Sequence, residues 1–173
     1  MLRTVQINGS NANNEELRKI YESAFTGGEQ YPYDVIIRVT LERGEHSDFT
    51  AYYDGGLLVG LTYVHLLTRF NYGAYFAVRA DLRGKGYGQT ILTTLLGKYS
   101  KGKPFIIGVE SLLEENAPNL EIRKRRHAFF IRKGFRDTGV NYDYNGVLFT
   151  IMSNSEEPFS QQDFDELNSE LPE

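Results

Sequence analysis

The sequence predicts an α+β fold, that is, a mixed α/β sheet of about six or seven strands flanked by helices. Short β-rich runs alternate along the chain with amphipathic helical stretches. Tight turns containing glycine join two pairs of these runs, as in β-hairpins. In the middle of the chain a β-rich run, a glycine-rich loop, a helical stretch and an apolar run follow one another, which is the order of a right-handed parallel crossover.

Length and composition indicate one globular domain. A chain of 173 residues can bury one sizeable core. It has no run of about 18 apolar residues, and its N-terminus lacks the basic-then-apolar layout of a signal peptide, so a cytoplasmic protein without a membrane span is expected. Cysteine is absent, and His46, His65 and His127 do not have the spacing of zinc ligands, so no metal site is expected.

The first half of the chain predicts four or five strands and one or two helices. Asn13 or Asn14 caps a helix whose apolar residues recur at helical spacing, and Gly27 ends it. Residues 33–41 fit a strand and also a helix opened by Pro32, and periodicity leaves both open. The strands are expected at residues 2–7, 49–53, 57–66 and 70–78, with a turn at Asp54-Gly55-Gly56.

The second half predicts three helices, a further strand and a hairpin. An amphipathic helix follows the glycine loop with Ile91, Leu92 and Leu95 on one face. A later helix, expected at 119–133, stops at Gly134, beyond which Phe135 folds back on the last turn. The remaining elements are a strand at 104–110, a hairpin of 138–144 and 147–153 around Asn145-Gly146, and a final helix capped by Ser160 and Asp163.

Charge is distributed unevenly along the chain. The formal net charge is -4, yet residues 156–173 carry seven acidic residues and no basic one, so the rest of the chain is mildly basic. We interpret residues 156–173 as an acidic, solvated helical extension that follows a single domain of residues 1–155.

The glycine loop predicts an anion site. It reads Arg83-Gly84-Lys85-Gly86-Tyr87-Gly88. Its glycines leave the main chain uncovered, so successive N–H groups can approach a phosphate, and the following helix adds the positive end of its dipole. A P-loop is disfavoured because Gly84-Lys85 is followed by Gly86 and Tyr87 and not by Ser or Thr, and a dinucleotide fingerprint is disfavoured because the third glycine arrives one residue early. A phosphorylated cofactor is therefore expected.

The pattern that remains, Arg83, Gly86 and Gly88, resembles the Arg/Gln-x-x-Gly-x-Gly/Ala signature of the GCN5-related N-acetyltransferase (GNAT) superfamily. The resemblance extends over about residues 5–152 and includes Ala128–Phe135, which is similar to the family's later helix ending in Gly-Phe. It implies a mostly antiparallel twisted sheet with a parallel crossover at the coenzyme A loop and about four helices. Only the acidic C-terminal helix falls outside the resemblance. It also favours a helix for the ambiguous stretch after Pro32.

The resemblance further implies acetyl-coenzyme A as acetyl donor. The main chain of Phe76, Ala77 and Val78 would pair with the pantetheine arm, and the Val78 N–H would stabilise the oxyanion of the tetrahedral intermediate. Phe130 would lie at the coenzyme. The pyrophosphate would be held by the loop and the first helical turn, that is, by Arg83, Gly84, Lys85, Gly86, Tyr87, Gly88 and Gln89.

The implied reaction moves an acetyl group to a primary amine of a small molecule, peptide or protein by direct attack in a ternary complex. A lysine-like amine with a pKa of about 10.4 is about 0.04% neutral at pH 7, a penalty of roughly 4.6 kcal/mol that a base or desolvation must offset. Glu110, at the end of the 104–110 strand, is the candidate base; the alternative is that this carboxylate is merely solvated.

One position departs from the family pattern. Many members carry a tyrosine where this chain has Phe130, and that tyrosine protonates the departing thiolate. Tyr87, Tyr142, Tyr144 or solvent could supply the proton instead. The alternative is a non-catalytic module that binds coenzyme A, a nucleic acid or an acidic partner.

The basic run Arg123–Arg126, continued by Arg132, Lys133 and Arg136, is interpreted as a solvated helix surface paired with acids such as Glu121. A clamp for the coenzyme's 3′-phosphate, an acidic acceptor site and nucleic-acid binding are the alternatives, and nucleic acid is disfavoured. The sequence leaves the acceptor and a homodimer open.

Overall fold

The computed structural model describes residues 1–25, 31–99 and 102–172. Its strands are β1 Arg3–Gln6, β2 Ser47–Asp54, β3 Leu57–Leu66, β4 Asn71–Val78, β5 Phe105–Glu110, β6 Arg136–Tyr144 and β7 Val147–Ser153. Its helices are α1 Glu15–Ala24, α2 Tyr33–Arg43, α3 Tyr87–Lys98, α4 Leu120–Arg132 and α5 Gln161–Ser169, with 3-10 turns η1 Gly44–His46 and η2 Ala80–Leu82.

The predicted fold class is confirmed. Over the described residues the chain forms a mostly antiparallel seven-stranded sheet with one parallel pair, in the order β1-β2-β3-β4-β5-β7-β6. Strands β4 and β5, which flank α3 in the chain, are neighbours in this order, as the predicted crossover requires. Within the described part of the chain no helix is both long and apolar enough to cross a membrane.

The chain divides into two compact units. The first unit consists of Met1–Leu66 and Gly73–Gly102, and the second unit consists of Leu67–Tyr72 and Lys103–Glu173.

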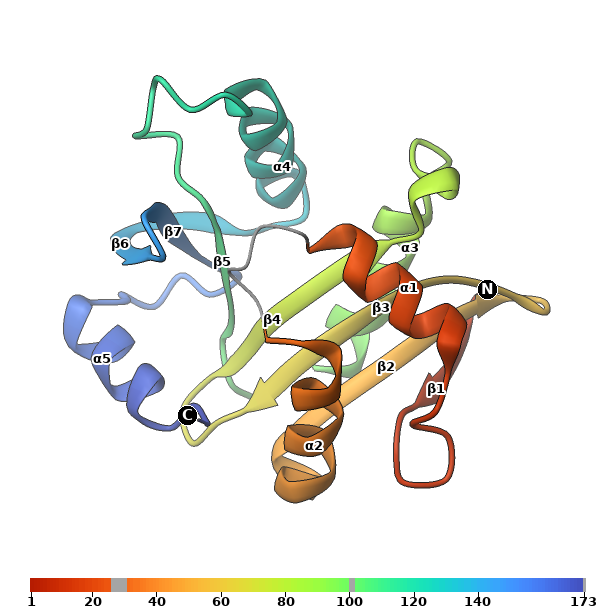
Figure 1. The fold of residues 1–173 in the computed structure, drawn as a ribbon. Coiled ribbons are helices and arrows are strands. Elements are labelled where there is room, and N and C mark those ends of the chain that lie inside the picture. Colours follow the sequence, from red (N-terminus) through yellow and green to blue (C-terminus); the bar gives the residue numbers. More distant parts are fainter. Residues whose placement is uncertain (26–30, 100–101, 173) are drawn as a thin grey trace. The chain divides into compact units, whose positions relative to one another are not determined.

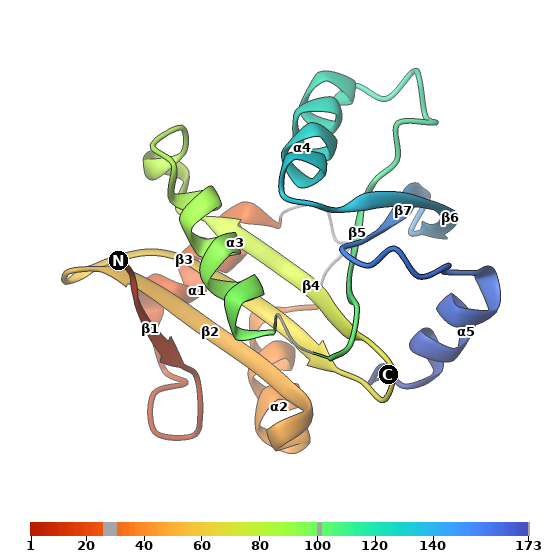
Figure 2. The same cartoon turned by 180° about the vertical axis from the view of Figure 1, so that it is seen from behind.

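In the first unit, helices cover both faces of the strands. Strand β2 pairs antiparallel with β1 and β3, and its successive side chains point to opposite faces. Phe49 and Ala51 belong to the hydrophobic cluster that contains α1 and α2, whereas Tyr52 belongs to the cluster that contains Ile91 of α3. Figure 1 shows α1 and α2 in front of these strands, and Figure 2, seen from behind, shows α3 on the opposite face.

The helix starts in this unit follow local chemistry. Of the two predicted caps, Asn14 is the one used, because its side chain accepts a hydrogen bond from the Leu17 N–H at 3.0 Å. The ambiguous stretch after Pro32 is helix α2, as the family resemblance favoured, and it buries Ile36 on its inner face. The predicted stop at Gly27 lies outside the described residues.

Both predicted hairpin turns are confirmed. Asp54 pairs with Leu57 across the first turn, and Gly55 has a φ of +60°, the positive value that a type II′ turn needs at this position. In the β6–β7 turn, Asn145 and Gly146 have φ values of +51° and +83°, as in a type I′ turn.

A β-bulge in β3 sets the point at which the chain leaves β4. Tyr52 pairs with Gly60 and Tyr53 pairs with Leu58, so Val59 has no opposite residue in β2. The Val59 carbonyl instead accepts a hydrogen bond from the Arg79 N–H at 2.8 Å, immediately after β4. The bulge thereby anchors the start of the connection to α3.

Gly60 is the point of closest approach between β3, β4 and α3. A Cβ atom at this position would lie 2.5 Å from the Ala77 carbonyl oxygen and 2.6 Å from Cδ1 of Ile91. Because Gly60 has no positive φ, glycine is required here by the lack of space. The missing side chain allows α3 to pack directly on the sheet.

In the second unit, β7 pairs antiparallel with both β5 and β6. Phe135 folds back on the end of α4, as predicted: its N–H donates to the Phe130 carbonyl at 3.0 Å, and the two rings lie 5.6 Å apart. Gly134, with a φ of +90°, makes this reversal.

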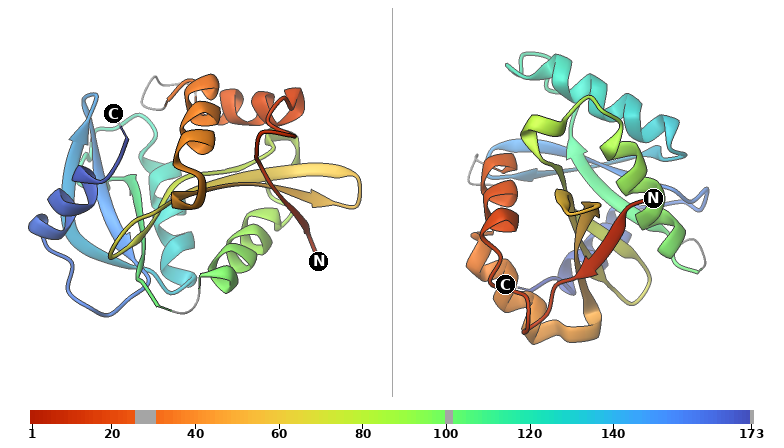
Figure 3. Two further views of the ribbon diagram at one scale, coloured as in Figure 1. Left: turned by 90° about the horizontal axis from the view of Figure 1, so that it is seen from below. Right: turned by 90° about the vertical axis from the view of Figure 1, so that its right-hand side faces the viewer.

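Helix α5 packs as part of the second unit. The predicted capping box of Ser160 and Asp163 is present, and Leu167 is buried in a cluster with Ile106 of β5 and Ile151 of β7. The turn before β4 also holds the helix. Arg69 contacts Asp163 at 3.0 Å and Glu166 at 2.5 Å, and Thr68 hydrogen-bonds to Glu170. Figure 3 shows α5 beside the β6–β7 hairpin.

We expect Gly60→Ala to destabilise the protein by about 1–3 kcal/mol, because the new methyl group overlaps a main-chain oxygen that cannot move without shifting β4. Chemical denaturation followed by circular dichroism measures this loss. Gly56→Ala is the matched control: a Cβ atom there meets nothing within 4 Å, so a change within about 0.5 kcal/mol is expected. Equal stability of the two variants would contradict the close approach.

Candidate functional site

The glycine loop lies in the first unit between η2 and α3. Gly84 and Gly86 have φ values of +80° and +87°, which residues with a side chain rarely adopt. A Cβ atom at either position would meet no atom within 4 Å, so the backbone conformation and not the space demands glycine. Gly88 is different: its φ is not positive, and a Cβ atom would make ordinary contacts with Val78 at 3.6 Å and Phe76 at 3.8 Å.

The start of α3 has the electrostatics of an anion site. Gly86 is its N-cap, and the first turn that follows contains no acidic residue. The first amide groups of a helix have no acceptor within the helix and carry the positive end of its dipole. Arg83 and Lys85 are exposed beside them. This combination of bare amides and two cations fits a pyrophosphate group.

Buried and bonded side chains fix the loop in place. Leu82 packs in the cluster with Ile91 of α3. The Tyr87 hydroxyl donates to Oδ2 of Asp54 at 2.6 Å, and this hydrogen bond raises the pKa of Tyr87. Arg83 reaches back to the Val78 carbonyl with an Nε–O distance of 3.4 Å.

The other end of α3 is also tied to β2. Lys98 donates to Oδ2 of the buried Asp48 at 2.8 Å, and the Tyr99 hydroxyl donates to the same oxygen. Burial alone would raise the pKa of Asp48, but the hydrogen bonds from Lys98, Thr50 and Tyr99 lower it below its ordinary value. Asp48 and Asp54 lie at the two ends of β2, so one strand holds both ends of the helix.

The predicted donor-binding residues of the first unit therefore lie together. Phe76, Ala77 and Val78 end β4 directly before the connection to the loop, and Gln89 is exposed in the first turn of α3. Phe76, Val78 and Tyr87 pack against the same small cluster. Glu110 and Phe130 belong to the second unit.

Glu110, the last residue of β5, is held by three donors. Its Oε2 accepts hydrogen bonds from Nδ2 of Asn119 at 3.0 Å and pairs with Nη2 of Arg123 at 3.1 Å. Its Oε1 pairs with Nη1 of Arg126 at 3.1 Å. The candidate base is thus neither unbound nor merely solvated, an arrangement that the sequence did not predict.

The two ion pairs of Glu110 differ in how firmly they are held. The Arg123 side chain is 6% exposed, and loss of one partner from a buried pair costs about 3–5 kcal/mol. The Arg126 side chain is 58% exposed, and an exposed pair contributes about 0.2–1 kcal/mol. Oε2 is therefore fixed in place, whereas Oε1 has a partner that is easily displaced.

Arg123 also orders the segment that follows β5. Its Nη1 donates to the Ser111 carbonyl at 3.0 Å and to Oε1 of Glu114 at 2.9 Å, and Glu114 in turn accepts from the Leu148 N–H of β7 at 3.0 Å. Hydrogen bonds from the Arg123 side chain and the Leu148 N–H lower the pKa of Glu114. The segment between β5 and α4 is thereby tied to both α4 and β7.

The interpretation of the basic run as a solvated surface is wrong for Arg123, which is buried because three acceptors and Asn119 surround its guanidinium. It is right for Lys124, which is exposed and pairs with Glu121 at 3.2 Å. Arg125 is exposed as well. The neighbouring His127 lies 3.5 Å from Asp137.

Phe130 is half-buried at the end of α4. Its ring lies 5.2 Å from that of Phe129 and 5.6 Å from that of Phe135, in edge-to-face contacts. Among the tyrosines considered as proton donors in its place, Tyr142 is stacked between Phe149 and Phe164, and Tyr144 is exposed.

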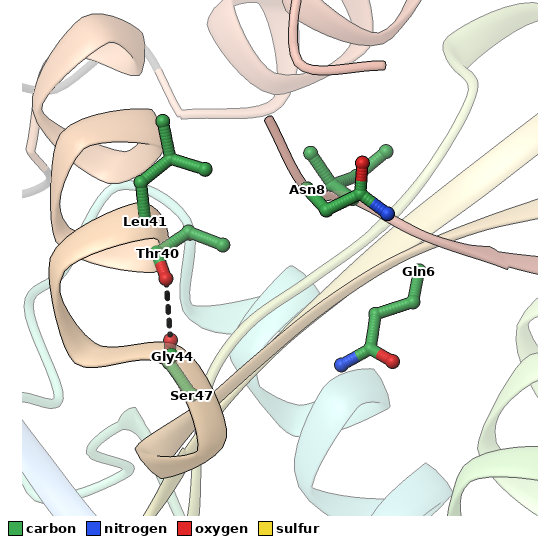
Figure 4. Close-up of a pocket in the computed structure, with 7 residues that line it drawn as sticks. Gln6, Asn8, Thr40, Leu41, Gly44 and Ser47 are labelled. Atoms are coloured by element: carbon green, nitrogen blue, oxygen red, sulfur yellow. Dashed lines mark hydrogen bonds between the residues drawn. The ribbon is translucent and has the colours of Figure 1, made fainter. Parts of the chain in front are cut away.

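The first unit also contains a pocket of about 310 Å³ between β1 and α2 (Figure 4). Gln6 and Asn8 line it from one side, and Thr40 and Leu41 line it from α2. The hydroxyl of Ser47, which also lines the pocket, donates to the Thr40 carbonyl at 3.5 Å. None of the predicted site residues lines this pocket.

The fold and the loop define a class of protein, the mixed α/β domains in which a basic glycine loop connects a central strand to a helix. Within this class the chain belongs to the acetyltransferase (GNAT) family, whose model matches residues 14–135. A search of the curated proteins finds no match.

Solved structures of the family have the same fold. A GNAT-family protein from Bacteroides thetaiotaomicron is 21% identical with a TM-score of 0.76, over 98% of this chain and 95% of its own. An aminoglycoside 6'-N-acetyltransferase complexed with coenzyme A is 14% identical with a TM-score of 0.68, over 91% and 99%. The ribosomal-protein-S18-alanine N-acetyltransferase from Escherichia coli is 12% identical with a TM-score of 0.65, over 93% and 97%.

We expect Arg123→Ala to lower the free energy of unfolding by about 3–5 kcal/mol, because it leaves the carboxylates of Glu110 and Glu114 without their buried partner. Urea denaturation measures the effect. Lys124→Ala, one position further on, removes a cation from an exposed pair, so its effect should stay below about 1 kcal/mol. The buried network is refuted if both variants unfold at the same urea concentration.

Proposed function

We propose that this protein is an N-acetyltransferase that moves an acetyl group from acetyl-coenzyme A to a primary amine of a small molecule, peptide or protein. The observation that carries the proposal is the loop before α3, where Gly84 and Gly86 expose the main chain between Arg83 and Lys85. Membership of the GNAT family supports it, as does the coenzyme A complex of the similar aminoglycoside acetyltransferase.

In this proposal the first unit binds the donor. The amides from Arg83 to Gln89 and the two basic side chains hold the pyrophosphate. The main chain of Phe76 to Val78 pairs with the pantetheine arm, and the Val78 N–H donates to the oxyanion that forms on the thioester carbonyl. Phe130 contributes an apolar surface for the coenzyme.

Glu110 of the second unit acts as the base on the acceptor. Its carboxylate takes a proton from the ammonium group, and the neutral amine then attacks the thioester carbonyl carbon. Collapse of the tetrahedral intermediate breaks the C–S bond and releases the thiolate, and the nitrogen gives up its second proton to solvent as the amide forms. Phe130 has no proton to give. A thiolate can leave without a strong acid, because alkyl thiols are moderately acidic, with a pKa of about 8.5 for free cysteine, and solvent then protonates it.

The proposal is tested by a thermal-shift and calorimetry titration with acetyl-coenzyme A, followed by an amine panel with thiol detection. We expect the coenzyme to raise the melting temperature and at least one amine to release thiol. Binding without thiol release across the panel would favour a second function, a non-catalytic coenzyme A-binding module, for which Phe130 is the motivating residue. Absence of binding would overturn the donor assignment.

Gly86→Ala should weaken coenzyme A binding by about tenfold, because the free loop of the variant relaxes out of the left-handed conformation and must return to it on binding, at a cost of about 1–2 kcal/mol. Gly88→Ala should bind as the wild type does, because its φ is not positive and the added methyl group makes only ordinary contacts. Isothermal titration of both variants decides the matter. An equal loss of coenzyme A affinity in the two variants would show that the left-handed backbone conformation at Gly86 is not required for binding.

Glu110→Gln should lower the rate of thiol release by about 10²- to 10⁴-fold at neutral pH, since no base then removes the ammonium proton. The deficit should shrink as the pH approaches the amine pKa of about 10.4, because more of the acceptor is already neutral. Glu115→Gln, an exposed position in the same segment, is the control with a wild-type rate. A wild-type rate in Glu110→Gln would remove this residue from the mechanism.

A further inference from the structure

The two oxygens of the Glu110 carboxylate have different surroundings. Oε2 is held by Asn119 and by Arg123, whose side chain is 6% exposed. Oε1 has a single ion-pair partner among the described residues, Arg126, whose side chain is 58% exposed. One oxygen is thus part of the interior, and the other faces a cation at the surface.

Arg126 has no second acid to hold it. Among the described residues Glu110 is its one ion-pair partner, whereas Arg123 pairs with Glu110 and Glu114. When Arg126 turns away from Oε1 it reaches solvent directly, and Glu110 stays oriented because Asn119 and Arg123 keep their contacts with Oε2.

We infer that Oε1 of Glu110 is a binding position for the ammonium group of the acceptor, and that Arg126 occupies this position until the acceptor displaces it. The inference rests on the proposed function, in which the acceptor is a protonated primary amine before it reacts. Guanidinium and ammonium groups both donate charge-assisted hydrogen bonds to a carboxylate oxygen. Because the acceptor ammonium group takes the place of the Arg126 guanidinium, Oε1 of this partly buried carboxylate is paired with a cation both before and after the exchange.

This arrangement selects the chemical class of the acceptor. A neutral amide or hydroxyl group brings no positive charge and cannot compete with a guanidinium for Oε1. A protonated amine can compete with the guanidinium. Its ammonium proton then lies at Oε1, the oxygen of Glu110 that accepts the proton in the proposed reaction. Arg126 is therefore a positioning residue that sets the affinity for the acceptor, and Glu110 is the group that the acceptor contacts.

The chain supplies a matched control in Arg125. It is the neighbouring residue of α4, it is exposed, and no ion pair joins it to Glu110. Removing either arginine changes the net charge equally, but only removal of Arg126 vacates Oε1. A general effect of charge on a cationic ligand would appear in both variants.

The test titrates 1,5-diaminopentane, a compact diammonium probe, into the full chain in the presence of coenzyme A. Arginine side-chain Nε resonances are followed by NMR, and the Arg126 signal is assigned by its loss in Arg126→Ala. We expect this signal to shift on titration. Affinity for the probe should rise about two- to fivefold in Arg126→Ala, which is the loss of one exposed pair, and should stay unchanged in Arg125→Ala and Arg126→Lys.

Glu110→Gln should abolish the gain that Arg126→Ala produces, since the oxygen then carries no charge. Unchanged affinity in Arg126→Ala, or an equal gain in Arg125→Ala, would overturn the inference. A parallel thiol-release assay separates this outcome from failure of the proposed function. If thiol is released but Arg126→Ala does not raise the affinity for the probe, the inference is wrong and the proposed function stands. If Arg126→Ala raises the affinity but no thiol is released, the protein has an ammonium site but is not an acetyltransferase.

Discussion

The packing of α3 on the β2–β3 hairpin is the constraint on which the first unit depends. Gly60 leaves the space that Ile91 fills, while Asp48 and Asp54 hold the two ends of the helix. A helix fixed in its middle and at both ends cannot rotate about its axis. The amides at its N-terminus therefore keep one direction. The packing of α3 in the interior thus fixes the geometry of the binding loop at the surface.

In the second unit an apolar cluster packs α5 against β5 and β7, whereas charge orders the segment between β5 and α4. Arg123 is buried only because Glu110, Glu114 and the Ser111 carbonyl surround its guanidinium. The same contacts give the segment after β5 a defined path. A buried cation thus orders a connection that contains few buried apolar side chains, and it leaves one carboxylate oxygen turned towards a weaker partner.

Sequence patterns were sufficient where one residue determines a local conformation. The Asn145-Gly146 turn, the Gly134-Phe135 reversal and a helix cap at Asn13 or Asn14 were all predicted, because the backbone or cap chemistry at each site admits few other residues.

They were insufficient where the partner lies far along the chain. Arg123 reads as one member of a basic run, and nothing in the order of residues shows that Glu110 and Glu114 surround it; only Asn119, one helical turn earlier, shares its helix face. The bulge at Val59 is equally invisible, since residues 57–61 are apolar apart from Gly60 and show no alternation that a bulge would interrupt.

The second unit also depends on distant partners for its completion. It joins residues 67–72 to residues 103–173, and its contact between Thr68 and Glu170 spans 102 positions. A chain emerges from the ribosome N-terminus first, so the β2–β3 hairpin can form early, whereas a contact of this span must close a long loop. Helix α5 is accordingly made after all the other elements of the second unit, and its contacts complete the folding of the unit that carries Glu110.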